Sequence, residues 1–194
     1  MKSLAEYREE LTKKHSYIRE EAIALIIGFA MLCIALLWYR ERMFHFDAAF
    51  YLFELVQQNK FNFFHDRYIS LITQSLPLAL HYFGFSLKSV ASSYSAALPI
   101  AQLAVLFFLF KWIRDGRYLL LFLLVILSSV RYRFFSPISE THFVLIFSFL
   151  YFLFAQRTSI KYRWENTGTL IVLFLASISH PVALVPVLAL WGIT

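Results

Sequence analysis

The sequence predicts an all-α protein, a polytopic transmembrane helix bundle with interfacial amphipathic helices in its first extracytoplasmic loop. Of its 194 residues, 60% are hydrophobic, 19% are aromatic and only 15% are charged. The charges gather in clusters between long apolar runs. One uncharged run, from Ala22 to Tyr39, matches the roughly 20 residues that a helix needs to cross a bilayer. Further apolar runs follow to the end of the chain, so several spans are expected.

The run at 22–39 is predicted to be a permanent first span. We expect residues 1–21 to form a charged cytoplasmic segment and residues 22–194 to form one transmembrane domain. The preceding residues are mostly polar and no small-residue cleavage site follows the run, so a cleavable signal peptide is not expected. Cys33, the only cysteine, lies inside this span, which excludes an intrachain disulfide. Basic residues that flank spans account for the net charge of +6, so nucleic acid is not an expected partner.

Two uncharged runs follow, at 68–87 and 89–110. If only the second crosses the membrane, the basic residues of the next two loops share the cytoplasmic side with the basic N-terminal segment, as the positive-inside rule favours. If the first run also crosses, both basic loops move outside. We therefore expect a first extracytoplasmic loop at about 40–91 and later spans near 92–110, 117–131 and 141–156, with a fifth from about 166. The chain ends at Thr194 within an apolar run, and we expect the natural protein to continue.

The run at 68–87 carries a polar stripe with helical spacing. The stripe consists of Ser70, Thr73, Gln74, Pro77 and His81 on an otherwise apolar segment. Such a helix is typical of the membrane interface. The alternative is a spanning helix whose polar face meets other helices.

Candidate functional residues begin just after the first span. If 45–54 is helical, Asp47, Tyr51 and Glu54 share one face near the membrane surface, with His45 at its start. A carboxylate partly desolvated by aromatic neighbours could act as a general base towards a hydroxyl. The simpler interpretation of an isolated Asp47 is a solvated residue or a helix N-cap.

Two further groups are expected on the same side. Arg67 could pair with a phosphate, or it could anchor the chain at the headgroups or pair with Asp66. The outer ends of spans three and four carry basic, acidic and imidazole groups, namely Arg131, Arg133, Glu140 and His142. The arginines could bind an anionic substrate or snorkel from short spans. Because Glu140 borders a span, its charge requires a partner, which favours a functional role.

The remaining motifs exclude other site classes. His180, before Pro181, ends a helix or lines a site. The histidines are scattered without metal-ligand spacing, so no divalent metal is indicated, and no glycine-rich phosphate loop is present.

The order of these features along the chain resembles the N-terminal half of proteins of the GT-C superfamily. These proteins are polytopic membrane glycosyltransferases, mannosyltransferases among them, that use polyprenyl-phosphate-linked sugars. The resemblance covers about residues 20–194. Its motifs are Phe46-Asp47-Ala48-Ala49-Phe50-Tyr51, Arg67-Tyr68-Ile69-Ser70, Gln74-Ser75-Leu76-Pro77, Gly84-Phe85-Ser86, Ser139-Glu140-Thr141 and Ser179-His180-Pro181.

The resemblance implies an inverting sugar transfer outside the cytoplasm, from a lipid-linked donor to an acceptor hydroxyl. Asp47 would be the general base, and Glu140 would orient acceptor or sugar. Arg67, or Arg131 and Arg133, would offset charge on the departing polyprenyl phosphate. The bilayer and the lipid-linked donor are the implied partners, and no further cofactor is implied. The family's C-terminal part, which helps to hold the donor, is absent, so this chain alone is expected to be inactive.

Two other function classes fit part of the pattern. A transporter or flippase component would need charged residues near mid-span, and the clear spans carry almost none. A non-enzymatic membrane scaffold would use the aromatic first loop to bind a partner or lipid. In that case Asp47 and Glu140 would be far apart and solvated.

Overall fold

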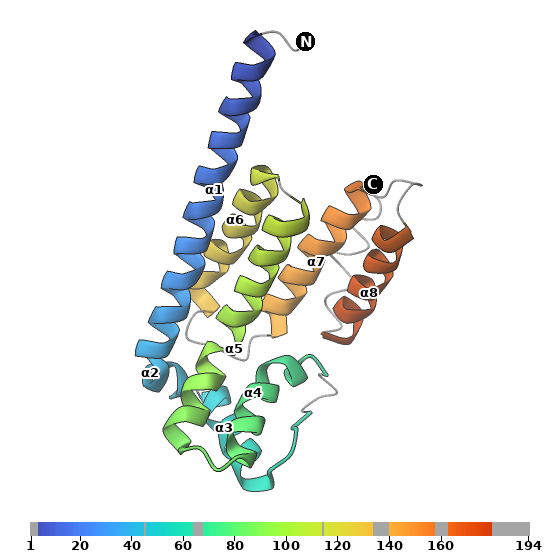
Figure 1. Ribbon diagram of the computed structural model, residues 1–194. Coiled ribbons are helices and arrows are strands. Elements are labelled where there is room, and N and C mark those ends of the chain that lie inside the picture. The colour runs from blue at the N-terminus through green and yellow to red at the C-terminus, as the bar shows by residue number, and fades with distance from the viewer. Residues whose placement is uncertain are drawn as a thin grey trace.

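The computed structural model describes residues 4–44, 46–63, 68–113, 115–133, 140–157 and 163–179. Across these ranges every regular element is a helix, which confirms the all-α fold class (Figure 1). In chain order the elements are α1 (Leu4–Leu37), α2 (Tyr39–Met43), α3 (Phe46–Gln58), α4 (Ser70–Tyr82), α5 (Leu87–Phe108), the π-helical turn η2 (Leu109–Ile113), α6 (Gly116–Arg133), α7 (Glu140–Arg157) and α8 (Arg163–Ser179).

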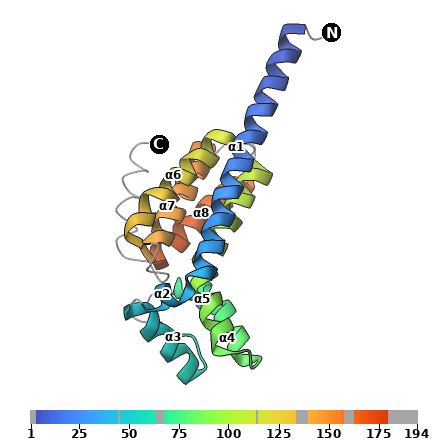
Figure 2. The same cartoon turned by 90° about the vertical axis from the view of Figure 1, so that its left-hand side faces the viewer.

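The helices form a bundle with a cap at one end. Helices α1, α5, α6, α7 and α8 make the bundle, and the short helices α2, α3 and α4 lie together at its lower end in Figures 1 and 2. Bundle helices alternate in direction, so α1, α6 and α8 begin at the upper end. The end of α6 and the start of α7 therefore lie at the same end as the cap.

Local signals fix the helix ends in the cap. Helix α3 stops at Gln58 because Asn59 takes a left-handed conformation with φ of 50°. Gly84, with φ of +74°, turns the chain after α4. Ser86 then caps α5, since its Oγ accepts a hydrogen bond from the Ser89 backbone N–H at 3.2 Å. The α4–α5 turn is thus encoded within a few residues.

Small residues let α1 approach α5 closely. Among residues 19–37 of α1, whose burial the structure describes, Ala24, Gly28 and Ala35 are buried. A Cβ added at Gly28 would stand 2.7 Å from Leu103 Cδ2 and 3.0 Å from Leu106 Cδ1. A larger residue at position 28 would require the ends of the Leu103 and Leu106 side chains to shift, so the crossing shows the small-residue packing common between membrane helices.

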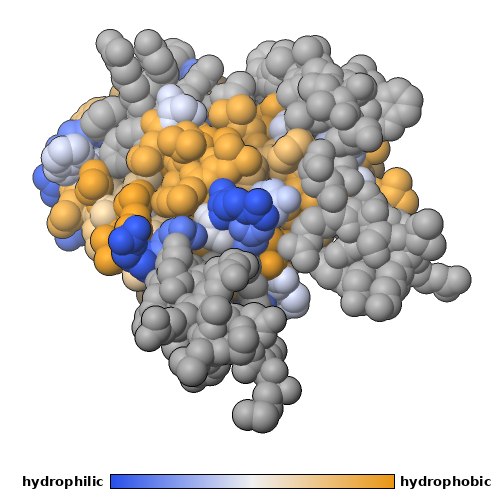
Figure 3. Space-filling view, turned by 90° about the horizontal axis from the view of Figure 1, so that it is seen from above, coloured by the Kyte–Doolittle hydropathy of each residue, from blue (hydrophilic) through white to orange (hydrophobic). Residues whose placement is uncertain are grey.

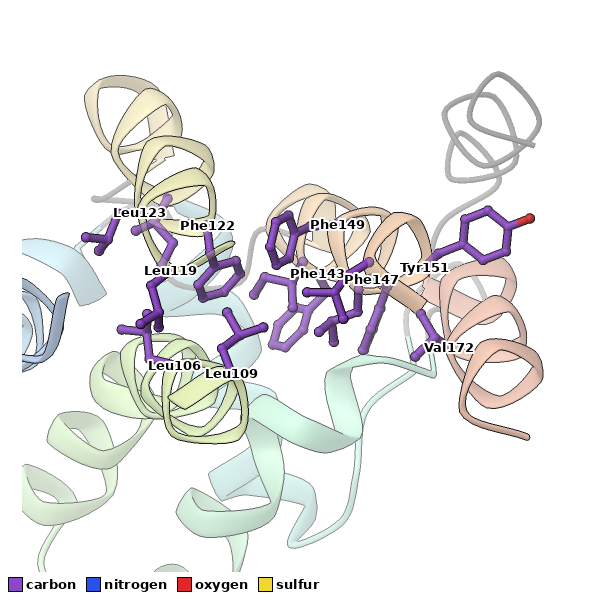
Figure 4. Packing of buried hydrophobic residues seen from close by; sticks show 14 of the residues in the cluster. Leu106, Leu109, Leu119, Phe122, Leu123, Phe143, Phe147, Phe149, Tyr151 and Val172 are labelled. Atoms are coloured by element: carbon purple, nitrogen blue, oxygen red, sulfur yellow. The ribbon is translucent and has the colours of Figure 1, made fainter. Parts of the chain in front are cut away.

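Leucine and phenylalanine side chains fill the space between α5, α6 and α7. Figure 4 shows Leu106 and Leu109 facing Leu119 and Phe122, and the α7 phenylalanines continue this layer. The Phe122 and Phe149 rings lie 5.1 Å apart between centroids. Val172 of α8 packs beside α7.

The helix bounds refine the expected spans. In the part of the chain that the structure describes, two helical segments, Arg19–Leu37 and Leu87–Ile113, are long and apolar enough to cross a membrane, and Gly116–Ser128 and His142–Phe154 are shorter apolar helices. Helices α6 and α7 have 18 residues each, longer than the predicted 117–131 and 141–156. One unbroken helix runs from Leu4 to Leu37, so α1 contains most of the predicted N-terminal segment together with most of the first apolar run.

Helix α4 is too short to cross a bilayer. It has 13 residues, or about 20 Å of helix against roughly 30 Å of hydrocarbon. Its polar stripe faces the protein, since Ser70, Thr73, Gln74 and Pro77 are buried. Leu71, Ile72 and Leu76 are exposed instead. This distribution is the reverse of that on the surface helix of a soluble protein.

Apolar side chains also cover much of the remaining described surface. Seen from above, hydrophobic colour dominates the coloured part of Figure 3, and hydrophilic residues gather in a few patches. On α1, exposed side chains include Ile26 and Phe29. Only 17% of the apolar segment of α1 is buried, so α1 is unlike the core helix of a soluble protein.

Candidate functional site

The acidic face of α3 is the first candidate site. Asp47 lies in the first turn of α3, and Glu54 follows two turns later on the same face, as predicted. Gln58 Nε2 donates a hydrogen bond to Glu54 Oε2, which shows that this face continues along the helix.

Glu54 belongs to a hydrogen-bonded network that joins α3 to α4. Asn62 Nδ2 donates to Glu54 Oε2 at 3.5 Å. Gln74 Oε1 accepts from the Asn62 backbone N–H at 2.8 Å, and Gln74 Nε2 donates to the Asn62 carbonyl at 2.9 Å. Gln74 is fully buried, and both ends of its amide are occupied. It therefore holds the segment after α3 in place, and neither end is free for the substrate contact predicted for it.

Asp47 is accessible and uncommitted. Its side chain is exposed, so the predicted partial desolvation by aromatic neighbours is not found within the described residues. It makes no hydrogen bond or ion pair with any residue that the structure describes. A carboxylate in this state can accept a proton or a hydrogen bond from a ligand.

Tyr51 and His142 are packing residues. Tyr51 is half-buried against the cluster of Met43, Ala48, Ala91 and Tyr94. His142, in the first turn of α7, is 5% exposed. The predicted substrate contacts of both residues would therefore need a rearrangement of the surrounding side chains.

The other predicted site residues are described in part or not at all. The backbones of Arg131 and Arg133 end α6, and that of Glu140 begins α7, so all three lie at the capped end of the bundle (Figure 1). Their side chains are outside the described part. His45, Arg67 and His180 lie outside the described residues altogether.

A buried arginine that the sequence did not single out joins α1, α2 and α5. Arg42 is 1% exposed. Its Nε donates to Ser95 Oγ at 2.8 Å, and its Nη2 donates to the Ser95 carbonyl at 3.0 Å. Ser95 Oγ in turn donates to the Ala35 carbonyl at 2.7 Å, near the end of α1. Burial lowers the pKa of Arg42 to about 10, which leaves the guanidinium charged at neutral pH.

Proline 99 explains why the Ser95 carbonyl is available. In a regular helix this carbonyl accepts the N–H four residues later, but Pro99 has no N–H. Arg42 donates to the acceptor that the proline leaves unpaired. The pair Ser95 and Pro99, four residues apart in an apolar run, is a sequence signal that could have identified this junction.

An open apolar pocket lies on the other side of α3. Its volume is about 590 Å³, and α3 contributes Ala49, Leu52, Phe53 and Val56 to its wall. Ala49 follows Asp47 by two residues, which places it roughly 200° around the helix from that carboxylate. Helix α3 therefore separates the acidic face from the apolar pocket.

Comparisons of the chain with protein-family models, curated proteins and solved structures found no significant match. Within the described residues, no group of three or more His, Cys, Asp or Glu side chains could hold a metal ion.

Proposed function

We propose that the protein is an integral membrane protein whose α1 and α5 cross the bilayer, with α6, α7 and α8 completing a polytopic bundle. The exposed apolar surface of α1 and the reversed polarity of α4 support this. Lipid would cover these apolar side chains, which water would solvate poorly. Helices of 18 residues, or about 27 Å, suffice for α6 and α7 with slight local thinning of the bilayer.

The capped end is proposed to face away from the cytoplasm. The start of α1, the end of η2, the start of α6, the end of α7 and the start of α8 all lie at the opposite end of the bundle (Figure 1), and these helix ends include basic residues such as Lys111, Arg117 and Arg157. The positive-inside rule then assigns that basic end to the cytoplasm.

At the capped end the protein is proposed to transfer a sugar from a polyprenyl-phosphate donor to an acceptor hydroxyl, as GT-C enzymes do. The observation that carries this proposal is the exposed carboxylate of Asp47 in the first turn of α3, which no described residue binds. The position of α3, the end of α6 and the start of α7 at the same end of the bundle supports it (Figure 1). One substrate could then contact the carboxylate of Asp47 and the arginines at the end of α6.

The chemistry assigned to these groups is an inverting displacement. Asp47 accepts the acceptor hydroxyl proton while the acceptor oxygen bonds to the anomeric carbon. The bond from that carbon to the phosphate oxygen breaks, and the polyprenyl phosphate departs with the electron pair. Arg131 and Arg133 would offset its negative charge, and Glu140 would orient the acceptor.

A non-enzymatic scaffold is the second candidate, and the solvation of Asp47 favours it. A scaffold requires no shielding of that carboxylate, whereas a general base benefits from a drier site. Transport is disfavoured because the two long apolar segments carry no charged residue near mid-span.

Transfer assays on membranes that contain the protein at its natural length would test the proposal, because the 194 residues alone are expected to be inactive. The assay supplies radiolabelled polyprenyl-phosphate sugars and measures incorporation into membrane acceptors. We expect wild-type membranes to exceed empty ones and Asp47→Asn to lower the rate by roughly a hundredfold or more. Glu41→Gln, an exposed acid on α2, is the matched control and should keep the wild-type rate. Incorporation that no donor raises, or that Asp47→Asn leaves unchanged, would count against sugar transfer.

A further inference from the structure

The apolar pocket behind α3 is an open groove whose walls are themselves exposed. Phe44 of the α2–α3 connection is 84% exposed, Phe53 of α3 is 60% exposed, and Leu87 at the start of α5 is 63% exposed. Large apolar side chains that line an open groove of about 590 Å³ mark a binding surface for something apolar.

The position of the groove along the chain sets its depth relative to the bilayer. The apolar segment of α1 ends at Leu37, and the groove begins two residues later with Tyr39. Trp38, which is exposed, and Tyr39 form the aromatic pair typical of the headgroup region. If α1 crosses the membrane, as proposed above, the groove opens where acyl chains meet their headgroups.

A cation lies on the rim of the groove. Arg40 lines it, and its Nε donates to the Tyr39 hydroxyl at 3.2 Å. The Arg40 guanidinium carbon lies 5.9 Å from the Tyr39 ring centroid, so the ring helps to orient the charge. The terminal nitrogens of Arg40 make no hydrogen bond to any residue that the structure describes, which leaves them available to an anion. A guanidinium in this state suits a phosphate.

From these observations we propose that the groove binds an anionic glycerophospholipid of the bilayer. One acyl chain occupies the apolar wall formed by Ala49, Leu52 and Phe53, and the phosphate pairs with Arg40. The lipid is held on the face of α3 opposite Asp47, so it is a bound structural lipid and takes no part in sugar transfer. It stabilises the position of the cap on the end of α1.

Native mass spectrometry of the detergent-purified full chain tests this site. Phosphatidylglycerol and phosphatidylcholine with the same acyl chains are added in equal amounts, and the bound fraction of each is measured. We expect preferential binding of phosphatidylglycerol. Arg40→Gln should lower that preference roughly fivefold, near the upper limit for an exposed charge pair. Ala49→Trp, which fills the groove, should abolish binding of both lipids.

Two controls separate the site from general effects on the protein. Arg117→Gln removes an exposed arginine from the opposite end of the bundle, and Ala79→Trp adds the same ring to exposed α4. Both should bind as the wild type does, with unchanged helical circular dichroism. Lipid binding that Ala49→Trp leaves intact, or a preference that Arg40→Gln leaves intact, would overturn the proposal. Displacement of the lipid by an equal amount of polyprenyl phosphate would also overturn it, because the groove would then hold the sugar carrier.

The test separates the lipid site from the membrane span on which it rests. Alkaline carbonate extraction of the same membranes reports whether the chain is integral. If the chain stays in the membrane but does not bind the lipid as expected, only the proposed lipid site is contradicted. If carbonate releases the chain from the membrane, the proposal that α1 crosses the bilayer is contradicted as well.

Discussion

Arg42 is the largest fully buried side chain among the described residues. Its neighbours explain how the protein tolerates the buried charge. Pro99 leaves the Ser95 carbonyl without its helical donor, and Arg42 supplies one. Ser95 Oγ then donates a hydrogen bond to the Ala35 carbonyl. This carbonyl is one of the last four of α1, and the carbonyls in that position lack an N–H donor from their own helix. The guanidinium also lies near the negative end of the α1 dipole. One arginine thus helps to satisfy the irregular ends of two helices.

This arrangement predicts that Ser95→Ala destabilises the protein. The change removes a hydroxyl that accepts from Arg42 and donates to Ala35, so two buried polar groups lose a partner. We expect a loss of about 1–3 kcal/mol in the free energy of unfolding. Unfolding by sodium dodecyl sulfate in mixed micelles, followed by circular dichroism, measures it. Ser128→Ala, which removes an exposed hydroxyl bonded only to the preceding turn, should change stability by about 0.5 kcal/mol or less. Equal effects of the two substitutions would contradict the assigned role.

At the scale of elements, helix positions were more predictable than side-chain roles. Apolar runs gave α5, α6, α7 and α8 to within a few residues, because the length and hydrophobicity of a helix are local properties. The period of the α4 stripe was also read correctly from the sequence. The direction in which the stripe faces was not predictable from the sequence. It depends on the hydrogen bond between Gln74 and Asn62, which lies twelve residues earlier in an irregular segment. Arg42 was missed for the same reason, since its partner Ser95 lies on another helix.

The crossing of α1 and α5 offers a test at this scale. Gly28→Leu would place a side chain where Leu103 and Leu106 already lie, so these leucines must change conformation or the helices must separate. Overpacking of this kind costs about 1–3 kcal/mol. The same unfolding measurement applies, with Ala30→Leu as the control, because Ala30 is an exposed position on α1. If Ala30→Leu destabilised the protein as much as Gly28→Leu, the close crossing would not be a determinant of stability.

For the molecule as a whole, the proposed sugar transfer and lipid binding depend on which side of the membrane each end of the bundle faces. Alternating helix directions bring the end of α6 and the start of α7 to the end that carries α3 and α4, and they bring the end of η2, the start of α6 and the end of α7, which carry basic residues, to the other end (Figure 1). Sugar transfer at Asp47 and lipid binding at Arg40 both require the capped end to lie at a membrane surface. Under the proposed topology, charge asymmetry assigns that surface to the extracytoplasmic side.

Cysteine labelling in intact cells tests which end of the bundle faces the outside. In a Cys33→Ser background, single cysteines replace Lys60 and Ser75 at the capped end, and Lys111 and Arg117 at the basic end; all four positions are exposed. An impermeant thiol reagent is applied before and after permeabilisation. The account predicts that the first pair reacts in intact cells and that the second pair reacts only after permeabilisation. Labelling of Lys111→Cys and Arg117→Cys in intact cells, with Lys60→Cys and Ser75→Cys protected, would invert the bundle and contradict the account.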